Sequence, residues 1–294
     1  MIIGGSLLLS TKGILAKLIY AEGVPFDVLT STRAALALPM FWLWGWWRLG
    51  MPALFAPARR SIVLAMLVGV LAYYVGMMSD FYALTLIDAS LERVILFTYP
   101  VLVVIANACI VRRFPENRVI GAALLTYIGV FFVVGGLDVD LVATNARGTL
   151  FVLIAAITTG TYFLINERVS RRIGSIPFTV YAMTAATIAL LVHAGITTEM
   201  QEFVMDAETW MLMGILIVGV TALPLFMLAE GVRLIGAQRA ALVSTVGPPA
   251  TIAMAWMFLD ERMTSLQLGG ATAIIAGIII LELRLKEPPV EKGG

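Results

Sequence analysis

Long apolar stretches separated by short polar ones are the dominant pattern along this chain of 294 residues. A membrane-spanning helix needs about 20 mostly apolar residues. The segments that meet this requirement lie near 2–20, 26–47, 61–84, 89–111, 118–137, 148–167, 177–198, 209–230, 238–259 and 265–283. Glycine and proline inside several of them are compatible with helix, since neighbouring helices can satisfy the backbone groups that they free. The pattern predicts an all-α integral membrane protein with ten transmembrane helices.

Composition supports the same class and narrows the chemistry. Hydrophobic residues make up 60% of the chain and charged residues 13%, whereas a soluble domain carries roughly 25% charged residues. The 20 Lys and Arg nearly balance the 19 Asp and Glu, so we expect no nucleic-acid partner. The single cysteine, Cys109, and the single histidine, His193, supply neither a disulfide nor a set of metal ligands. We therefore expect no metal, no cofactor and no enzymatic activity.

The charged residues are distributed unevenly between the two ends of the predicted helices. Arginine pairs such as Arg59-Arg60 lie in the short loops on the side of both termini, where most of the Lys and Arg residues fall. The opposite loops are acidic and contain Glu22, Glu202 and Asp206. Because cytoplasmic loops carry the excess of Lys and Arg, we predict a multi-pass protein of the cytoplasmic (inner) membrane with both termini in the cytoplasm.

The second half of the chain repeats features of the first. At an offset of 148, residues 86–129 match 234–277, so that Pro100 falls on Pro248 and Gly129 on Gly277. Each half would contain five spans, and an odd number makes the second copy enter the bilayer from the opposite face. Inverted repeats of this kind are typical of secondary transporters, whose binding site lies near the midplane between the halves. A duplicated bundle without transport activity is the alternative.

This repeat also divides the chain. We predict a first five-helix repeat over 1–140, a second, inverted one over 141–284, and a disordered cytoplasmic tail over 285–294. The linkers between the predicted helices are short, which leaves no room for a soluble domain. We expect a monomer, with a dimer as the alternative.

Residues 81–104, 121–136 and 231–280 resemble the repeated EamA-type signature of the drug/metabolite transporter superfamily. Lys17 in the first span and Arg33 in the second also fit this pattern. The resemblance implies a ten-helix metabolite carrier similar to bacterial exporters of amino acids, aromatic ones among them. The second copy reads Leu-Asp-Glu-Arg at 259–262, but 111–114 of the first copy read Val-Arg-Arg-Phe. This difference argues against a role for the acidic pair of the second copy.

Prolines interrupt two spans near their middles, Pro100 in the fourth and the pair Pro248-Pro249 in the ninth. Each proline lacks a backbone donor and so frees the carbonyl four residues earlier. A free carbonyl at membrane depth is tolerated where it faces protein or water. We interpret these prolines as hinges beside a central cavity, with a static kink as the alternative.

Ionisable residues inside the spans are the strongest candidates for function, because burying one costs at least about 2.5–3.5 kcal/mol. Lys12 lies about nine residues from either end of the first span. It is a candidate ligand for a substrate carboxylate, and the alternatives are that it snorkels or pairs with an acidic neighbour. We predict that Asp80, Glu92 and Arg93 form an outer salt-bridge cluster, with ion coupling as the second possibility.

Tyrosines are the other candidate substrate ligands, since each offers an apolar ring with a hydrogen-bonding tip. Tyr82 shares a helix face with Tyr74 at a spacing of eight residues, and Tyr99 and Tyr162 lie in the fourth and sixth spans. Ser244 belongs to a stripe of small residues in the ninth span. Packing is the alternative role for all of these side chains.

Together these features predict a secondary transporter that exports small metabolites, above all neutral or aromatic amino acids, by alternating access around a cavity between the repeats. A multidrug, nucleotide or sugar carrier of the same fold is one alternative. A membrane-embedded enzyme or receptor without transport activity is another. No P-loop pattern occurs, so we do not expect ATP to drive transport directly.

Overall fold

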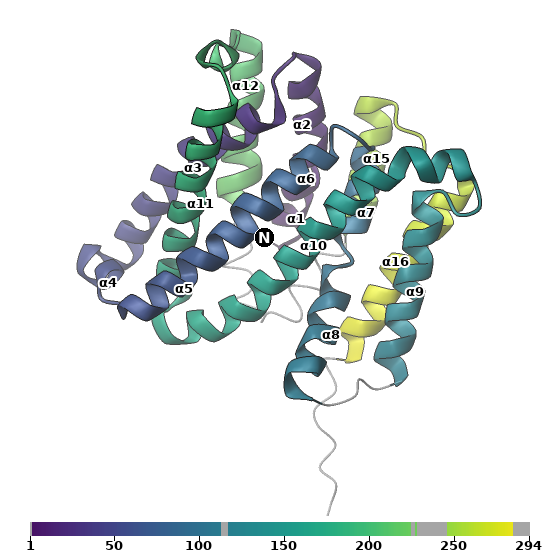
Figure 1. Ribbon diagram of the computed structural model, residues 1–294, viewed down its shortest axis with the longest axis horizontal. Coiled ribbons are helices and arrows are strands. Elements are labelled where there is room, and N and C mark those ends of the chain that lie inside the picture. The colour runs from purple at the N-terminus through teal and green to yellow at the C-terminus, as the bar shows by residue number, and fades with distance from the viewer. Residues whose placement is uncertain (1, 113–116, 225–226, 228–245, 285–294) are drawn as a thin grey trace, which may run out of the picture.

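The computed structural model describes residues 2–112, 117–224, 227 and 246–284, and within them the backbone is helical almost throughout, without strands (Figure 1). Four helical stretches of this part are long and apolar enough to cross a membrane: 3–21, 59–83, 139–170 and 175–197. This confirms the prediction of an all-α membrane protein. The number of spans stays a prediction, because the end of the eighth segment and the beginning of the ninth lie outside the described residues.

The helices of the first half follow the predicted segments closely. They are α1 (Ile2–Ser10), α2 (Lys12–Ala21), α3 (Phe26–Leu49), α4 (Met51–Phe55), α5 (Arg59–Gly69), the π-helical η1 (Val70–Gly76), α6 (Met77–Ala83), α7 (Ala89–Leu96), α8 (Tyr99–Val111) and α9 (Asn117–Val134). Two predicted spans are thus divided, the first at Thr11 and the fourth at Phe97 and Thr98. The third continues through η1 without interruption.

The second half contains α10 (Val139–Ile173), α11 (Ser175–Thr197), the 3-10 helix η2 (Met200–Phe203), α12 (Ala207–Ile215), the π-helical η3 (Leu216–Ala222), α15 (Gly247–Leu259) and α16 (Ser265–Arg284). The helix expected from 148 begins earlier, at Val139. The reason is local: the carboxylate of Asp138 accepts a hydrogen bond from the Leu141 amide at 3.0 Å and caps the helix there.

Two helix pairs flank the molecule. In Figure 1, α3 and α11 lie together on one side and α9 and α16 on the other, with α10 crossing between them. One hydrophobic core, which includes Phe41 and Met213, joins α3 to α11 and α12. A second, which includes Ile95 and Ile274, joins α7 to α9 and α16. Polar residues described below lie on the elements between these two cores.

The α9–α16 pair is in backbone contact. A Cβ atom at Gly129 would lie 2.6 Å from the carbonyl oxygen of Gly270, and one at Gly270 would lie 2.6 Å from that of Gly129. A Cβ atom at Gly277 would likewise lie 2.8 Å from the carbonyl oxygen of Ala122. At the offset of 148, Ala122 corresponds to Gly270 and Gly129 to Gly277. The contact between 129 and 270 therefore has its counterpart in the contact between 122 and 277.

All three candidate hinge prolines lie at the start of a helix. Pro100 is the second residue of α8, and Pro248 and Pro249 are the second and third of α15. The first residues of these helices, Tyr99 and Gly247, also correspond at the offset of 148. Proline is accepted in a first turn because the amide it lacks would have no partner within the helix. Ser244 and the predicted tail, 285–294, lie outside the described residues.

Candidate functional site

A cavity of about 130 Å³ lies among α2, α3, η1, α6, α7 and α10, and therefore among helices of both halves. Its lining combines a few charged side chains with apolar ones. The lining residues are Lys12, Arg33, Ala72, Tyr73, Gly76, Met77, Asp80, Phe81, Leu96, Ala155 and Thr159. Of the residues predicted to bind substrate, only Lys12 is in this list, and Asp80 comes from the predicted salt-bridge cluster.

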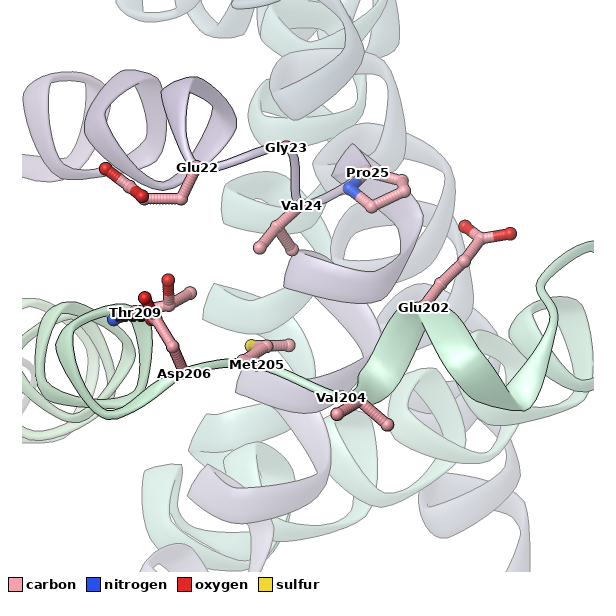
Figure 2. Close-up of a pocket in the computed structure, with 9 residues that line it drawn as sticks. All are labelled: Glu22, Gly23, Val24, Pro25, Glu202, Val204, Met205, Asp206 and Thr209. Carbon is pink, nitrogen blue, oxygen red and sulfur yellow. Dashed lines mark hydrogen bonds between the residues drawn. The ribbon is translucent and has the colours of Figure 1, made fainter.

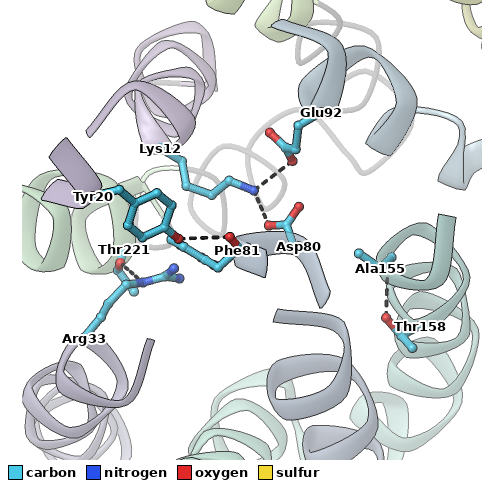
Figure 3. A network of polar contacts seen from close by, with 9 residues as sticks. All are labelled: Lys12, Tyr20, Arg33, Asp80, Phe81, Glu92, Ala155, Thr158 and Thr221. Carbon is cyan, nitrogen blue, oxygen red and sulfur yellow. Dashed lines mark hydrogen bonds and ion pairs between the residues drawn. The ribbon is translucent and has the colours of Figure 1, made fainter. Parts of the chain in front are cut away.

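Lys12 lies between two carboxylates from different helices (Figure 3). Its Nζ forms an ion pair with Asp80 of α6 and lies 3.1 Å from Oε1 of Glu92 of α7. The three side chains are 12%, 10% and 1% exposed. A buried charge is stable only when it is paired and hydrogen-bonded. Of the alternatives considered for Lys12, pairing with acidic neighbours is the one observed.

The predicted outer salt-bridge cluster forms differently from the expectation. Asp80 and Glu92 form ion pairs with Lys12 beside the cavity, and their location near the outer surface stays a prediction. Arg93 has no carboxylate within ion-pair distance among the described residues, and its guanidinium lies 5.0 Å from the ring centroid of Phe97. Neighbouring positions of α7 face different sides of the helix, which separates Glu92 from Arg93.

Arg33 is a cavity residue that was not among the candidate substrate ligands of the sequence analysis. Its Nε donates to Oγ1 of Thr221 at 2.8 Å, and its guanidinium lies 5.0 Å from the ring centroid of Phe81. Its Nη1 has no hydrogen-bond partner among the described residues. The signal was available in the sequence, because Arg33 lies about seven residues inside an apolar span and ionisable groups at such depth are costly.

The three candidate tyrosines lie outside the cavity lining. Tyr82 accepts a hydrogen bond from Nη2 of Arg147 at 2.6 Å, and Tyr99 stacks on Phe163 with centroids 5.2 Å apart. Tyr162 packs edge-on against Tyr73, which does line the cavity, at 5.1 Å. Tyr162 therefore supports the wall from behind, whereas Tyr82 and Tyr99 lie elsewhere.

The third span lines the cavity with a different face from the one that carries Tyr74 and Tyr82. Tyr82, which shares a face with Tyr74, was a candidate substrate ligand, but the third span lines the cavity with Tyr73 and Met77. The hydroxyl of Tyr74 instead lies 3.0 Å from Nδ1 of His193. The π-helical η1 has more residues per turn than an α-helix, so it rotates α6 relative to the face that a regular spacing predicts.

The break in the first span is held by α15. Oγ of Ser10 donates to the carbonyl oxygen of Gly247 at 3.0 Å, and Oγ1 of Thr251 donates to the carbonyl oxygen of Ser10 at 3.0 Å. A Cβ atom at Gly247 would lie 3.1 Å from Nη2 of Arg93. Gly247 and Thr251 of the small-residue stripe thus serve helix packing, the alternative named for that stripe.

At the end of the molecule where α7 begins, Glu261 links three elements. Its carboxylate accepts hydrogen bonds from the Ala89 amide at 2.9 Å and from the Ser90 amide and hydroxyl at 3.1 and 2.8 Å. Lys17 of α2 lies 3.3 Å away and also 3.7 Å from Asp88. These contacts give Glu261 a structural role, although the sequence difference at 111–114 had argued against a role for the acidic pair at 260–261. Its partners lie more than 170 residues away, and no local pattern reports such a contact.

Replacing Glu261 with glutamine tests this link. We expect the loss of the charge and of one acceptor to lower the free energy of unfolding by about 1–2 kcal/mol, because Glu261 caps α7. The measurement is thermal unfolding of the purified protein. The neighbouring Asp260→Asn is the control, since Asp260 is 81% exposed and pairs only with the exposed Arg262 among the described residues. Equal effects of the two substitutions would contradict the capping role.

A second, open groove of about 500 Å³ lies between the α2–α3 turn and the segment before α12 (Figure 2). Its lining includes Glu22, Glu202 and Asp206. The Thr209 side chain and amide, which donate to Asp206, hold the pKa of that carboxyl below its usual range. Among the described residues no group of three or more His, Cys, Asp or Glu is placed to hold a metal ion.

Comparison with known proteins gives consistent matches along the whole chain. The sequence model of the EamA-like transporter family matches residues 1–135 and 146–283. The "Uncharacterized transporter YcbK" of Bacillus subtilis (strain 168) is 30% identical over 290 residues, which cover 95% of this chain and 92% of that protein. The "Uncharacterized transporter YcxC" of the same organism is 23% identical and covers 96% and 93%. A solved crystal structure superposes with a TM-score of 0.67 over 97% and 98% of the two chains, at 17% identity, and so is similar in fold alone.

Proposed function

As this chain belongs to the EamA-like transporter family, and so is a membrane transporter of small substrates, we propose that it is a secondary carrier that exports neutral or aromatic amino acids. Export would proceed by alternating access around the cavity lined by Lys12, Arg33 and Asp80. The membrane would be the cytoplasmic one, with both termini in the cytoplasm, as the distribution of Lys and Arg favours.

The contacts between the halves support an inverted repeat as the basis of this mechanism. In the α9–α16 contact, the pair 129 and 270 and the pair 122 and 277 are equivalent at the offset of 148. A two-fold axis between equivalent helices requires such a pair of contacts. The family matches two ranges of similar length, 1–135 and 146–283. Inverted repeats allow one half to rock against the other around a site between them.

The chemistry of the cavity is the observation that carries the amino-acid proposal. Oδ1 of Asp80, Oε2 of Glu92 and Nη1 of Arg33 are buried and without a hydrogen-bond partner among the described residues. Buried polar atoms are normally satisfied. An amino acid offers an ammonium group for the Asp80 carboxylate and a carboxylate for the Arg33 guanidinium, both of which line the cavity. Phe81 and Leu96 supply an apolar wall for its side chain.

Counterflow in proteoliposomes tests the proposal. Vesicles containing the purified protein are loaded with unlabelled phenylalanine or threonine, and the uptake of the labelled amino acid is measured. We expect transient accumulation of label above equilibrium, which empty vesicles do not show. If neither amino acid drives uptake, amino-acid export by this chain is wrong. Collapsing the pH gradient in the same vesicles determines whether protons drive transport.

The helix starts at Pro100 and Pro248 provide a second prediction. An alanine at position 100 restores an amide that can donate to the carbonyl oxygen of Leu96, which would continue α7 into α8 and remove the bend. We expect Pro100→Ala and Pro248→Ala to slow exchange about tenfold while substrate affinity changes less than threefold, since hinge positions govern motion rather than contacts. Pro52→Ala in α4, at the start of a short helix remote from the cavity, is the control. Unchanged exchange rates would leave only a static bend.

A further inference from the structure

We infer that the cavity selects its substrate by a carboxylate group bound at Arg33, so that an organic acid without an ammonium group binds and the corresponding amine does not. The inference rests on the proposed function, because it names the substrate class of the same site. It differs from the initial interpretation, in which Lys12 was the ligand for the carboxylate.

Lys12 is already engaged. Its ammonium group has two carboxylate partners, Asp80 and Glu92, from two helices. A substrate carboxylate at Lys12 would have to displace one of them, and the displaced carboxylate would remain buried without its cation. Such a loss of one partner is strongly unfavourable. Lys12 is therefore better placed to hold α2, α6 and α7 together than to receive an anion.

Arg33 is held in place by contacts other than an ion pair in the part of the chain that the structure describes. Its Nε donates a hydrogen bond to Oγ1 of Thr221, and its guanidinium carbon lies over the ring of Phe81. Thr221 in turn donates to the carbonyl oxygen of Leu216 at 3.0 Å, which fixes the orientation of its hydroxyl. These contacts position the side chain and leave Nη1 without a hydrogen-bond partner among the described residues. A guanidinium so placed is suited to a carboxylate, which it binds with two parallel hydrogen bonds.

The balance of charge beside the cavity favours the same ligand. Among the residues that the structure describes, the cations are Lys12, Arg33 and Arg93 and the carboxylates are Asp80 and Glu92, so positive charge is in excess there. None of the ion pairs found in the described residues involves Arg33 or Arg93. Binding of a carboxylate would cancel the net positive charge beside the cavity. A zwitterion would leave that net charge unchanged, and an amine would increase it. In a site of low dielectric constant this difference decides which ligand binds.

The tyrosines near Arg33 do not change this balance. Tyr20 donates its hydroxyl to the carbonyl oxygen of Phe81 at 3.0 Å, and Tyr73 packs against Tyr162. Both are neutral hydrogen-bonding groups, so neither supplies the missing negative charge. Asp27, the second residue of α3, accepts hydrogen bonds from the Thr198 hydroxyl and the Val28 amide at the beginning of that helix.

Matched ligand sets test the inference in the purified, full-length protein. The first set is phenylalanine, phenylpropionate and phenethylamine, and the second is leucine, isocaproate and isoamylamine. Affinity is measured by thermal stabilisation and by competition in counterflow. We expect the acids to bind at least about tenfold more tightly than the amines, because a buried charge pair lost on removal of one partner is worth more than that. We expect the amino acids to bind as tightly as the acids or more weakly.

Variants of α3 separate binding from structural support. Arg33→Gln is expected to reduce the preference for acid over amine to less than about threefold, and Arg33→Lys to retain it in weakened form because lysine keeps the charge but not the planar fork. Arg48→Gln, at the exposed end of the same helix, is the control and is expected to match the unchanged protein. A merely structural arginine would alter stability without altering this preference.

Three results would overturn the inference: equal binding of acids and amines by the unchanged protein, no binding of either acid, or a full acid preference in Arg33→Gln. If Arg33→Gln does not fold, the first two results and Arg33→Lys still decide. Acids that bind through Arg33 without amino-acid counterflow would refute the proposed amino-acid export and leave this inference standing. Amino-acid counterflow together with an unaltered acid preference in Arg33→Gln would refute the role of Arg33 and leave the proposed amino-acid export standing.

Discussion

Replacing Lys12 with methionine is expected to lower the free energy of unfolding by about 3–5 kcal/mol and to abolish transport. The substitution keeps most of the apolar volume but leaves Asp80 and Glu92 buried without their shared cation. Since these partners lie on α6 and α7, the loss also loosens the wall of the cavity. The measurements are thermal unfolding of the purified protein and counterflow in proteoliposomes.

Two further variants make the Lys12 result specific. Lys17→Met removes a cation one helical turn or so further along α2, where the side chain is 23% exposed. We expect it to cost about 1 kcal/mol or less, as for a partly solvated pair. Adding Asp80→Asn to Lys12→Met is expected to recover part of the lost stability, because it removes one unpaired carboxylate. A Lys12→Met protein as stable as the original would show that the group does not support the fold.

Substituting Gly270 with valine is expected to destabilise the protein by about 1–3 kcal/mol or more, which overpacking of a tight contact typically costs. The new Cβ atom would lie 2.6 Å from the carbonyl oxygen of Gly129. Backbone atoms cannot rotate away as a side chain can, so α9 and α16 must separate. The measurement is again thermal unfolding of the purified protein.

The adjacent Gly269 offers a matched control for Gly270. A Cβ atom at Gly269 would have no heavy atom within 4 Å, and the same holds for Gly121 on α9. We expect Gly269→Val and Gly121→Val to change stability by less than about 0.5 kcal/mol, as surface substitutions usually do. Gly129→Val is expected to match Gly270→Val. If all four variants unfold alike, the contact between the helix backbones does not stabilise the pair.

Helix positions were largely predictable because the length of an apolar run reflects the thickness of the bilayer. Segments expected at 26–47, 177–198 and 265–283 correspond to α3, α11 and α16 within two residues at their ends. The internal offset of 148 also paired Pro100 with Pro248. Both features arise from spacing along the chain alone.

Which side of a helix faces the cavity could not be predicted in the same way. Tyr73 and Met77 line the cavity, whereas Tyr82 was the candidate ligand of this span, because η1 changes the register within an otherwise uniform apolar span. Contacts between distant segments left no trace in the local sequence either. Glu261 caps α7 across more than 170 residues, and its sequence context argued against a role.

The hydrogen bonds between Thr251, Ser10 and Gly247 have a mechanical consequence. Ser10 is bound to α15 through both its hydroxyl and its carbonyl oxygen, and Lys12 follows it two residues later. A shift of α15 therefore displaces the backbone beside Lys12, whose ammonium group is anchored on α6 and α7. Movement of α15 in the second half of the chain is in this way transmitted to the ion pairs of Lys12 with Asp80 and Glu92 in the first half, because only Thr11 separates Ser10 from Lys12.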